Sequence, residues 1–357
     1  MSSSDEEMST RKKNRQEEEQ AGDRISSLGD EILHKIMSFM NTKYAVQTCV
    51  LSKRWKYLWK SLPYLDFELQ TFPFKGSTYE EAVISLINFI TQVLFRRHRT
   101  DLVKVSFQSY NVPEPYAFIP QGLIAYAVDH NVQQLAINCG YHRLFVMPKS
   151  FYSCKSLTTL QVLNNLRLRI ELPKFLALPA LKSLHLRGVS VTKKGFNTED
   201  FSACPNLETL RLEVFFEEHN TLFINGPKLK RLELSLRGPY GKFGLKVVID
   251  APKLKTFHYD AIDPIVCSFG DLASIDDVNF SMYNCYPLGY EGDGEDEDYF
   301  DMPFDMYREY VLHCVDTFKK FHQAKSLTLP WRTVEAWKFS FPSTSFTFGL
   351  AKEHAEE

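Results

Sequence analysis

The sequence predicts an α/β protein in which a small N-terminal helical unit precedes a long solenoid of stacked parallel strands. One observation is the helical spacing of apolar residues in the segment 24–67. Another is a short pattern of three apolar positions that recurs at nearly constant intervals between residues 132 and 329. The composition agrees with a folded chain, because 44% of the residues are hydrophobic and 24% are charged, as in ordinary globular proteins.

The chain begins with a polar segment, residues 1–23, that has no periodic apolar pattern and is predicted to be a disordered tail. It has no apolar core of the kind a secretory signal needs. Its basic residues indicate either a nuclear-import signal or a solvated charge run, and the adjacent acids Glu17, Glu18 and Glu19 favour the charge run. These bases are Arg11, Lys12, Lys13 and Arg15.

Residues 24–67 are predicted to form three short helices. Ser27, with Asp30 three residues later, indicates a capping box at the start of the first helix, and Ser52 is expected to cap the third. A unit of this size can bury only part of its apolar surface. We therefore expect the rest to be exposed and to bind a partner. The apolar positions are Ile32, Leu33, Ile36, Met37 and Met40, then Ala45, Val46, Cys49 and Val50, then Trp55, Leu58 and Trp59.

A bridging helix is predicted over about residues 78–98. Glu80 and Glu81 lie near its start and a cluster of arginines lies near its end, which matches the helix dipole. A phosphate contact is the alternative reading of the arginines Arg96, Arg97 and Arg99.

From about residue 100 the chain repeats a pattern of apolar, two residues, apolar, one residue, apolar. The central residues of the copies are separated by 25, 24, 26, 22, 25 and 21 residues, and the last step is 49 residues. This spacing is the signature of leucine-rich repeats, in which each copy supplies one strand of a shared core. Prolines before several copies are typical of turns that lead into a strand. The central residues are Leu135, Leu160, Leu184, Leu210, Leu232, Phe257, Val278 and Leu327.

The residues between the leucines are expected to face outward on the concave side of the sheet. Together they predict either a basic belt that binds an acidic peptide, a phosphorylated site or a small anion, or an ordinary solvated sheet face. The candidate target-binding residues are His185, Arg187, Arg211, Glu213, Arg231, Glu233 and His258. The other outward positions are Thr159, Gln161, Leu163, Ser183, Thr209, Ser235, Thr256 and Asp260.

The formal net charge of −2 is uneven, because the segment 291–301 holds seven acids and no base. Without it the charge would be +5, which is too weakly basic for a dedicated nucleic-acid binder. We expect this segment to be a flexible loop inserted between repeats, with attraction of a basic partner as the alternative. No apolar run approaches the roughly 18 residues of a membrane span.

No motif in the sequence indicates catalysis or a bound cofactor. The seven cysteines are scattered without a CxxC pair, which predicts reduced and mostly buried thiols. The histidines show no metal-ligand spacing, and the sequence has no GxSxG, P-loop, GxGxxG or HExxH motif. We therefore expect no metal, no cofactor and no enzyme activity.

Two short motifs in the helical unit are specific when they occur together. They are Asp-Arg-Ile-Ser at residues 23–26 and Val-Leu-Ser-Lys-Arg-Trp at residues 50–55, followed by Leu58 and Trp59. With the repeats behind it, this segment closely resembles the F-box of plant-type F-box/leucine-rich-repeat proteins, and the resemblance covers most of residues 23–330. The resemblance implies that the F-box docks on a Skp-type adaptor, which joins a cullin and a RING subunit in a ubiquitin ligase, and that the repeats hold the target protein.

The resemblance also implies which F-box residues take part, without separating core positions from contacts. The candidate adaptor-binding residues are Leu28, Gly29, Ile32, Leu33, Ile36, Leu51, Trp55 and Leu58. Relatives usually have Leu-Pro where this chain has Leu28-Gly29, and glycine is expected to loosen the helix start. Many relatives also carry a C-terminal FBD domain, and residues 331–357 look too short to hold one.

The expected function is a non-catalytic substrate-recognition subunit of a Skp–cullin–F-box ubiquitin ligase in the nucleus or cytoplasm. The alternative is a repeat scaffold or decoy with a degenerate F-box. The expected domains are the tail (1–23), the F-box (24–67), a linker with the bridging helix (68–99), repeats (100–340) with the acidic loop at about 286–303, and a C-terminal tail (341–357).

Overall fold

The structure is a computed structural model that divides into two compact units, Met1–Ser109 and Tyr110–Glu357. It describes residues 25–72, 78–112, 114–116, 118–141, 147–163, 177–191, 204–216, 221–237, 246–261, 266–282, 317–318 and 320–329. The predicted N-terminal tail, acidic loop and C-terminal tail lie outside the described residues. Among the described residues no helix has the length and apolar character needed to cross a membrane.

The first unit opens with the three predicted helices. α2 spans Asp30–Met37, α3 spans Thr42–Gln47 and α4 spans Trp55–Leu58. Single 3-10 turns, η1 (Thr48–Val50) and η2 (Trp59–Ser61), follow α3 and α4. Their buried apolar side chains include Leu33, Met37, Ala45, Trp55 and Leu58.

Both predicted caps of these helices are wrong. The residue before α2 is Gly29, which has no side chain to cap the helix. The residue before α4 is Arg54, and the Ser52 hydroxyl lies instead 3.3 Å from the Ser26 hydroxyl. The contacts of such a serine depend on how distant parts of the chain meet within the unit. The spacing of residues near the serine does not reveal them.

The rest of the first unit is β1 (Tyr64–Glu68), η3 (Leu69–Thr71), α5 (Tyr79–Arg96) and β2 (Lys104–Val112). α5 confirms the predicted bridging helix, and Thr78 and Glu81 form a reciprocal capping box at its start. Arg97 is buried and donates to the Leu62 carbonyl at 2.5 Å, so this arginine has a structural role. β1 was not predicted; it pairs in parallel with β2.

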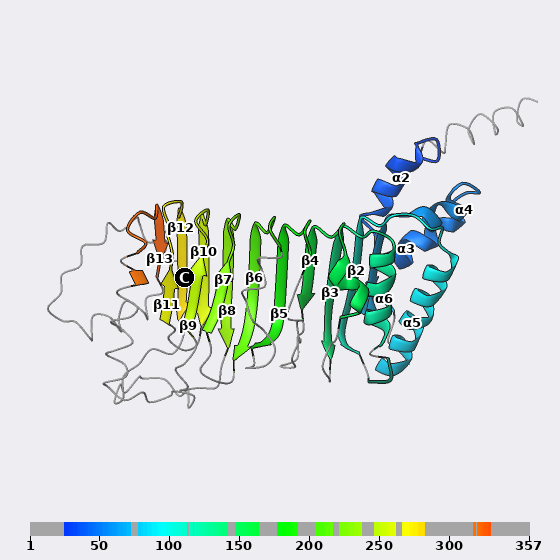
Figure 1. Ribbon diagram of the computed structural model, residues 1–357. Helices are drawn as coiled ribbons and strands as arrows, with labels where there is room; N and C mark the ends of the chain where they lie inside the picture. Colours follow the sequence, from blue (N-terminus) through cyan, green and yellow to red (C-terminus); the bar gives the residue numbers. More distant parts are fainter. Residues whose placement is uncertain are drawn as a thin grey trace, which may run out of the picture. The chain divides into compact units, whose positions relative to one another are not determined.

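In the second unit the main sheet has the strand order β3-β4-β5-β6-β8-β10-β12-β13 (Figure 1). Each strand in this order pairs in parallel with the next. The strands are β3 (Gln134–Tyr141), β4 (Thr159–Leu163), β5 (Ser183–Val191), β6 (Thr209–Phe216), β8 (Arg231–Arg237), β10 (Thr256–Ala261), β12 (Asp277–Met282) and β13 (Ser326–Thr328). The helical elements η4 (Glu114–Tyr116), α6 (Phe118–Asp129) and η5 (Lys149–Ser153) accompany the first of them.

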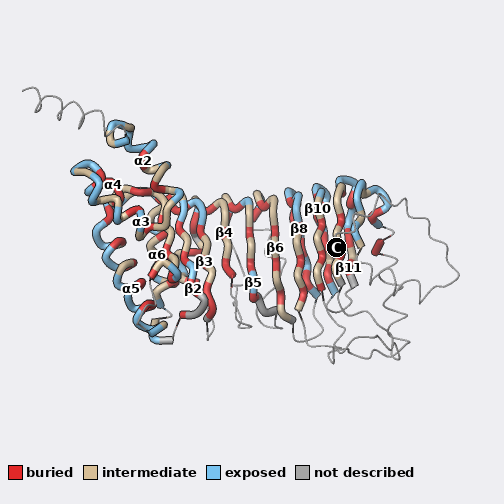
Figure 2. The backbone as a smooth tube through the Cα atoms, turned by 180° about the vertical axis from the view of Figure 1, so that it is seen from behind, coloured by how far each residue is buried: buried red, intermediate tan, exposed pale blue. Residues whose placement is uncertain are grey.

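The register of this sheet confirms the repeat alignment. Each central residue of the apolar pattern is the direct partner of the next one, from Leu135 opposite Leu160 to Val278 opposite Leu327. The 49-residue step is a single step across the sheet, because β12 pairs directly with β13. Buried and less buried residues alternate along the strands (Figure 2), as expected for a sheet with one face in the core.

A second, smaller parallel sheet has the order β11-β9-β7. Its strands are β7 (Thr221–Asn225), β9 (Lys246–Asp250) and β11 (Val266–Phe269). Its buried residues face the core side of the main sheet, since the rings of Phe269 and Phe257 lie 5.3 Å apart. The prediction of an α/β solenoid is confirmed, but this part of the second layer is strand rather than helix or irregular chain.

Aromatic rings fill the core near the last strands. Phe321 lies 5.0 Å from Phe269 and 5.7 Å from Phe280, and Phe318 lies 5.0 Å from Phe280. Phe318 and Phe321 are buried. The short segment before β13 thus covers the apolar end of the array, which a repeat stack requires.

Candidate functional site

The helical part of the first unit exposes an unusual number of large apolar side chains. Val50 is 83% exposed, Phe39 79% and Leu51 65%. Four further residues, Ile25, Ile32, Tyr44 and Tyr57, are also exposed. We call these seven residues the apolar surface of the first unit. Apolar side chains gathered at this density on so small a unit indicate an interaction surface.

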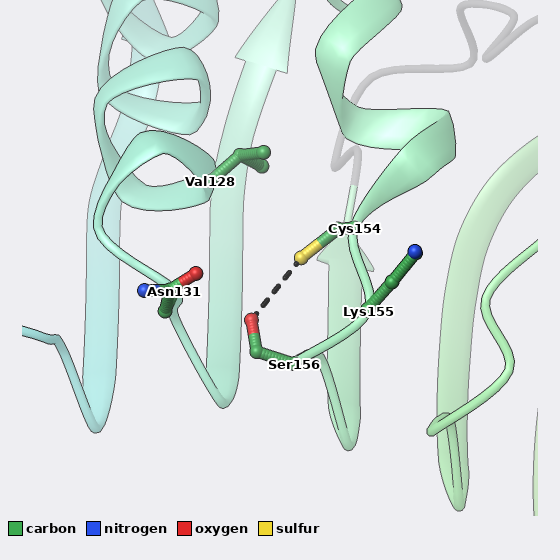
Figure 3. A pocket seen from close by; sticks show the side chains of 5 residues that line it. All are labelled: Val128, Asn131, Cys154, Lys155 and Ser156. Atoms are coloured by element: carbon green, nitrogen blue, oxygen red, sulfur yellow. Dashed lines mark hydrogen bonds between the residues drawn. The ribbon is translucent and has the colours of Figure 1, made fainter.

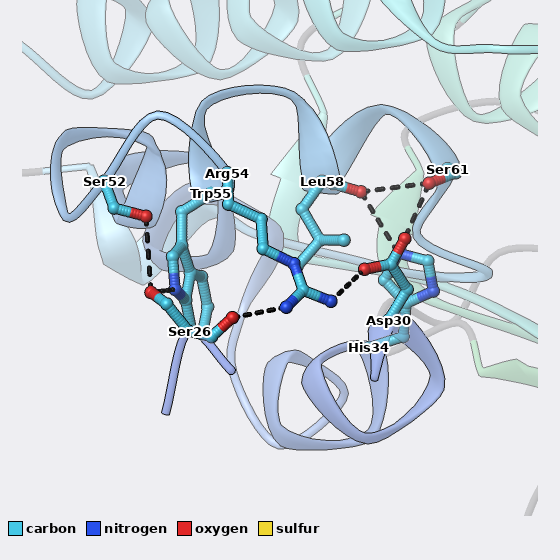
Figure 4. A network of polar contacts seen from close by, with 8 residues as sticks. All are labelled: Ser26, Asp30, His34, Ser52, Arg54, Trp55, Leu58 and Ser61. Carbon is cyan, nitrogen blue, oxygen red and sulfur yellow. Dashed lines mark hydrogen bonds and ion pairs between the residues drawn. The ribbon is translucent and has the colours of Figure 1, made fainter. Parts of the chain in front are cut away.

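Polar contacts hold the segment that carries the apolar surface (Figure 4). Arg54 donates to the Ser26 carbonyl and forms an ion pair with Asp30 at 2.6 Å, and Trp55 Nε1 donates to Ser26 Oγ at 3.0 Å. These bonds tie the start of α2 to α4. Because each bond joins residues that are far apart in the sequence, together they fix the positions of the helices that carry the exposed residues.

A second set of contacts joins α2 to the other end of α4. His34 Nε2 lies 3.1 Å from the Leu58 carbonyl and 3.3 Å from Ser61 Oγ, and Ser61 Oγ donates to the Leu58 carbonyl at 3.2 Å (Figure 4). α2 is therefore attached to both ends of α4. A change in the exposed residues can be tested without disturbing these bonds.

The structure sorts the predicted adaptor-binding residues into two groups. Leu33, Trp55 and Leu58 are buried, so they support the unit from inside and are not surface contacts. The remaining predicted residues reach the surface in part or in full, and they are Leu28, Gly29, Ile32, Ile36 and Leu51. The sequence did not single out Val50 and Phe39, the most exposed members, as contacts, because Val50 ends a single 3-10 turn and Phe39 follows the end of α2, where helical spacing no longer indicates which side chain faces inward.

The outer face of the main sheet pairs its charges across neighbouring strands. Arg187 Nε lies 2.8 Å from Glu213 Oε2, and Arg211 Nε lies 3.0 Å from Glu233 Oε2. Arg231 is the first residue of β8, lies opposite Thr209, the first residue of β6, and is exposed. The predicted basic belt is therefore largely neutralised by acids in register with it.

Two histidines lie in the same row of this face. Burial, followed by the charges of Arg211 and Arg187, lowers the pKa of His185 below its usual value, and Glu233 opposes this. His258 Nε2 lies 3.6 Å from Asp277 Oδ2. His185 thus adds no positive charge to the face at neutral pH. Leu163 lies opposite Arg187 in the register, which is the outward row as predicted, but its side chain is buried.

Two hollows lie away from this face. The larger is an open hollow of about 380 Å³ lined by Val128, Asn131, Cys154, Lys155 and Ser156, where Cys154 Sγ lies 3.4 Å from Ser156 Oγ (Figure 3). Within the described residues no group of three or more histidine, cysteine, aspartate or glutamate side chains is placed to hold a metal ion. Burial raises the pKa of Cys267 to about 12, so this thiol stays protonated.

The described cysteines behave as predicted. Cys49, Cys139, Cys154, Cys204 and Cys267 are free, and all but Cys49 are buried. Burial raises the pKa of the Cys204 thiol as well. Such thiols act as small apolar side chains in the core.

The fold and the apolar surface define a repeat protein with a small helical unit at its N-terminal end. The F-box domain model matches residues 25–67, and the model of the LRR repeats of FBD-associated F-box protein At5g56370 matches residues 121–267. The F-box protein At4g09920 of Arabidopsis thaliana is 32% identical over 248 residues, which cover 67% of this chain and 75% of that protein. The chain therefore belongs to the plant F-box/leucine-rich-repeat family.

Two further relatives from Arabidopsis thaliana carry the FBD name. The FBD-associated F-box protein At4g10400 is 33% identical over 66% of this chain and 55% of its own length. The putative F-box/FBD/LRR-repeat protein At5g44950 is 31% identical over 73% of this chain and 59% of its own length. The chain thus spans little more than half of these relatives. No solved structure gives a significant match.

Proposed function

We propose that the protein is the substrate-recognition subunit of a Skp–cullin–F-box ubiquitin ligase. The observation that carries the proposal is the apolar surface of the first unit, which lies on a segment held in place by the polar contacts of Arg54 and Trp55. An apolar surface of this kind suits a permanent protein partner, and the family membership supports a Skp-type adaptor as that partner.

In this proposal the protein acts by tethering and performs no bond chemistry itself. The F-box segment attaches to the adaptor, and through it to the cullin and RING subunits. The outer face of the main sheet holds the target, with His185, Arg187, Arg211, Glu213 and Arg231 among its contacts, beside Glu233 and His258. Tethering raises the effective concentration of target lysines near the charged ubiquitin carrier.

We also place the protein in the nucleus or the cytoplasm, where an adaptor and a cullin would meet it. The free thiols of the described cysteines support this proposal, because such thiols persist in reducing compartments.

Binding of the purified full chain to a Skp-type adaptor tests the proposal. Leu51→Asp should weaken binding by about tenfold or more, because a charge would replace an exposed apolar side chain of the surface. The matched control is Phe95→Asp on α5, a residue 86% exposed that lies outside the matched F-box segment. Equal losses in both variants, or none in Leu51→Asp, would contradict an adaptor interface at this surface.

Gly29→Pro separates the ligase subunit from the scaffold alternative. The φ of Gly29 is −61°, which proline adopts, and a Cβ at this position meets nothing within 4 Å. Binding by the natural chain supports the ligase subunit. Binding that appears only with Gly29→Pro would identify a degenerate F-box, and no binding by either form would refute the adaptor proposal.

A further inference from the structure

One charged side chain stands directly before each strand of the main sheet from β5 onward. Each of these residues donates its backbone N–H to the carbonyl of the equivalent residue one strand earlier, as in Lys230 to Glu208 and Lys255 to Lys230, both at 2.8 Å. The side chains therefore follow one another at the strand spacing of about 4.8 Å. In order along the sheet, they are Lys182, Glu208, Lys230, Lys255, Asp276 and Lys325.

Two more lysines lie in the turns just before this row. Lys228 and Lys253 each follow a proline and precede a row residue by two positions, and both are exposed. Lys228 Nζ donates to Asn206 Oδ1 at 2.7 Å, so side chains of this second row also meet across neighbouring turns. We call the six lysines of the two rows the lysine rim, which consists of Lys182, Lys228, Lys230, Lys253, Lys255 and Lys325.

The rim has more cations than its carboxylates neutralise. Glu208 pairs with Lys230 at 2.7 Å and Asp276 pairs with Lys325 at 2.8 Å. The other lysines still act on these acids: besides the bond to Lys230, the charges of Lys182 and Lys228 lower the pKa of Glu208. Bonding to Lys325 and the charge of Lys255 lower the pKa of Asp276, although burial opposes this.

We propose that the lysine rim binds an acidic, extended polypeptide segment of a partner protein. Its flexible ammonium groups can follow carboxylates at irregular spacing, which suits a chain rich in aspartate and glutamate. The described residues of the two rows include no aromatic side chain on which a nucleotide base could stack. They also include no arginine, whose planar fork favours phosphate.

This proposal goes beyond adaptor binding and does not depend on it. The rim lies in the second unit, and no rim residue belongs to the matched F-box segment. The rim is also distinct from the outer face of the sheet, where arginines are paired with acids in register. A protein with a non-functional F-box would still bind an acidic segment here.

Fluorescence anisotropy of a short labelled polyglutamate peptide with the full chain tests the proposal. We expect saturable binding that weakens strongly as ionic strength rises from about 0.05 M to about 0.3 M, because exposed charges are screened. The triple variant Lys228→Gln, Lys253→Gln, Lys255→Gln should weaken it by about tenfold or more, at a factor of about 2 to 5 for each exposed charge. The matched control is Lys104→Gln, Lys149→Gln, Lys246→Gln, which removes three exposed lysines outside the rim.

Glu208→Gln gives a test in the opposite direction. This change frees Lys230 and should tighten peptide binding by about twofold or more. Equal weakening in the control triple would show unspecific charge attraction and overturn the proposal, as would no binding at all. Tighter binding of an oligothymidylate of equal charge would assign the rim to nucleic acid instead.

Discussion

His185 shows how the environment of one residue sets the charge of a surface. Its side chain is half-buried between Gln161 and Arg211 on the neighbouring strands, and Arg187 lies two residues further along its own strand. Burial and the two arginines disfavour the imidazolium, so the pKa falls below 6.5. The residue that sequence reasoning placed in a basic belt is therefore neutral at pH 7.

The lowered pKa of His185 makes stability depend on pH in a defined direction. Below pH 6.5 the unfolded chain binds a proton that the folded chain resists, so this contribution is complete above pH 6.5 and is lost as the pH falls through the lowered pKa. We expect the Tm to fall between pH 7.5 and pH 5.5, and to fall less in His185→Gln. Thermal unfolding followed by circular dichroism measures both; parallel curves would show that the histidine is not responsible.

Gly29 permits a stability prediction that is separate from its effect on adaptor binding. Gly29→Pro should raise the free energy of unfolding by about 0.4 to 1 kcal/mol, because proline restricts the unfolded chain while the native φ of −61° suits it. Urea unfolding gives this difference. A lower midpoint in the variant would mean that the proline ring strains Leu28 before it.

At the scale of elements, the last described strands rely on aromatic packing from the residues just before β13. Phe321 contacts the rings of Phe257, Phe269 and Phe280, which belong to strands of both sheets. The ring of Phe321 therefore adds to the direct contact between Phe257 and Phe269 that joins the two layers at this end of the unit. Its loss should open a cavity that the rigid sheets cannot close.

Phe321→Ala should lower the free energy of unfolding by about 3 to 5 kcal/mol, as expected for truncation of a buried phenylalanine. Phe95→Ala is the control, since the side chain is 86% exposed and its loss should change stability by about 0.5 kcal/mol or less. Urea midpoints of the two variants give the comparison. If both lose equally little, the aromatic end unfolds independently of the sheet.

At the scale of the whole molecule, the repeats could be predicted down to the register of single residues. A repeat cannot bury its apolar face alone, so its leucines must align with those of its neighbours, and their spacing in the sequence determines which residues become partners. Leu184 opposite Leu210, and Phe257 opposite Val278, are partners for this reason. The second sheet was missed, although Leu222 and Ile224 alternate as a buried strand requires.

The candidate site was less accessible from sequence, because it depends on contacts between distant residues. Ile32 and Leu33 are neighbours on α2, yet one is exposed and the other buried, and α2 has too few turns to reveal which face is covered. The pairing of Arg187 with Glu213 likewise depends on which strands are adjacent. Such pairings are determined by the register of the strands in the sheet and cannot be read from the composition.

The alternation of main-sheet and second-sheet strands has an evolutionary consequence. Each of the main-sheet strands β6, β8 and β10 is followed along the chain by one strand of the smaller sheet. The chain then returns to the main sheet. An in-frame duplication of the segment from β8 to the residue before β10 would therefore add one strand to each sheet. The added strands would carry the leucines that they need for the core. The gene can lengthen the outer face of the main sheet by one strand, about 4.8 Å, without redesigning any existing contact except those at the point of insertion.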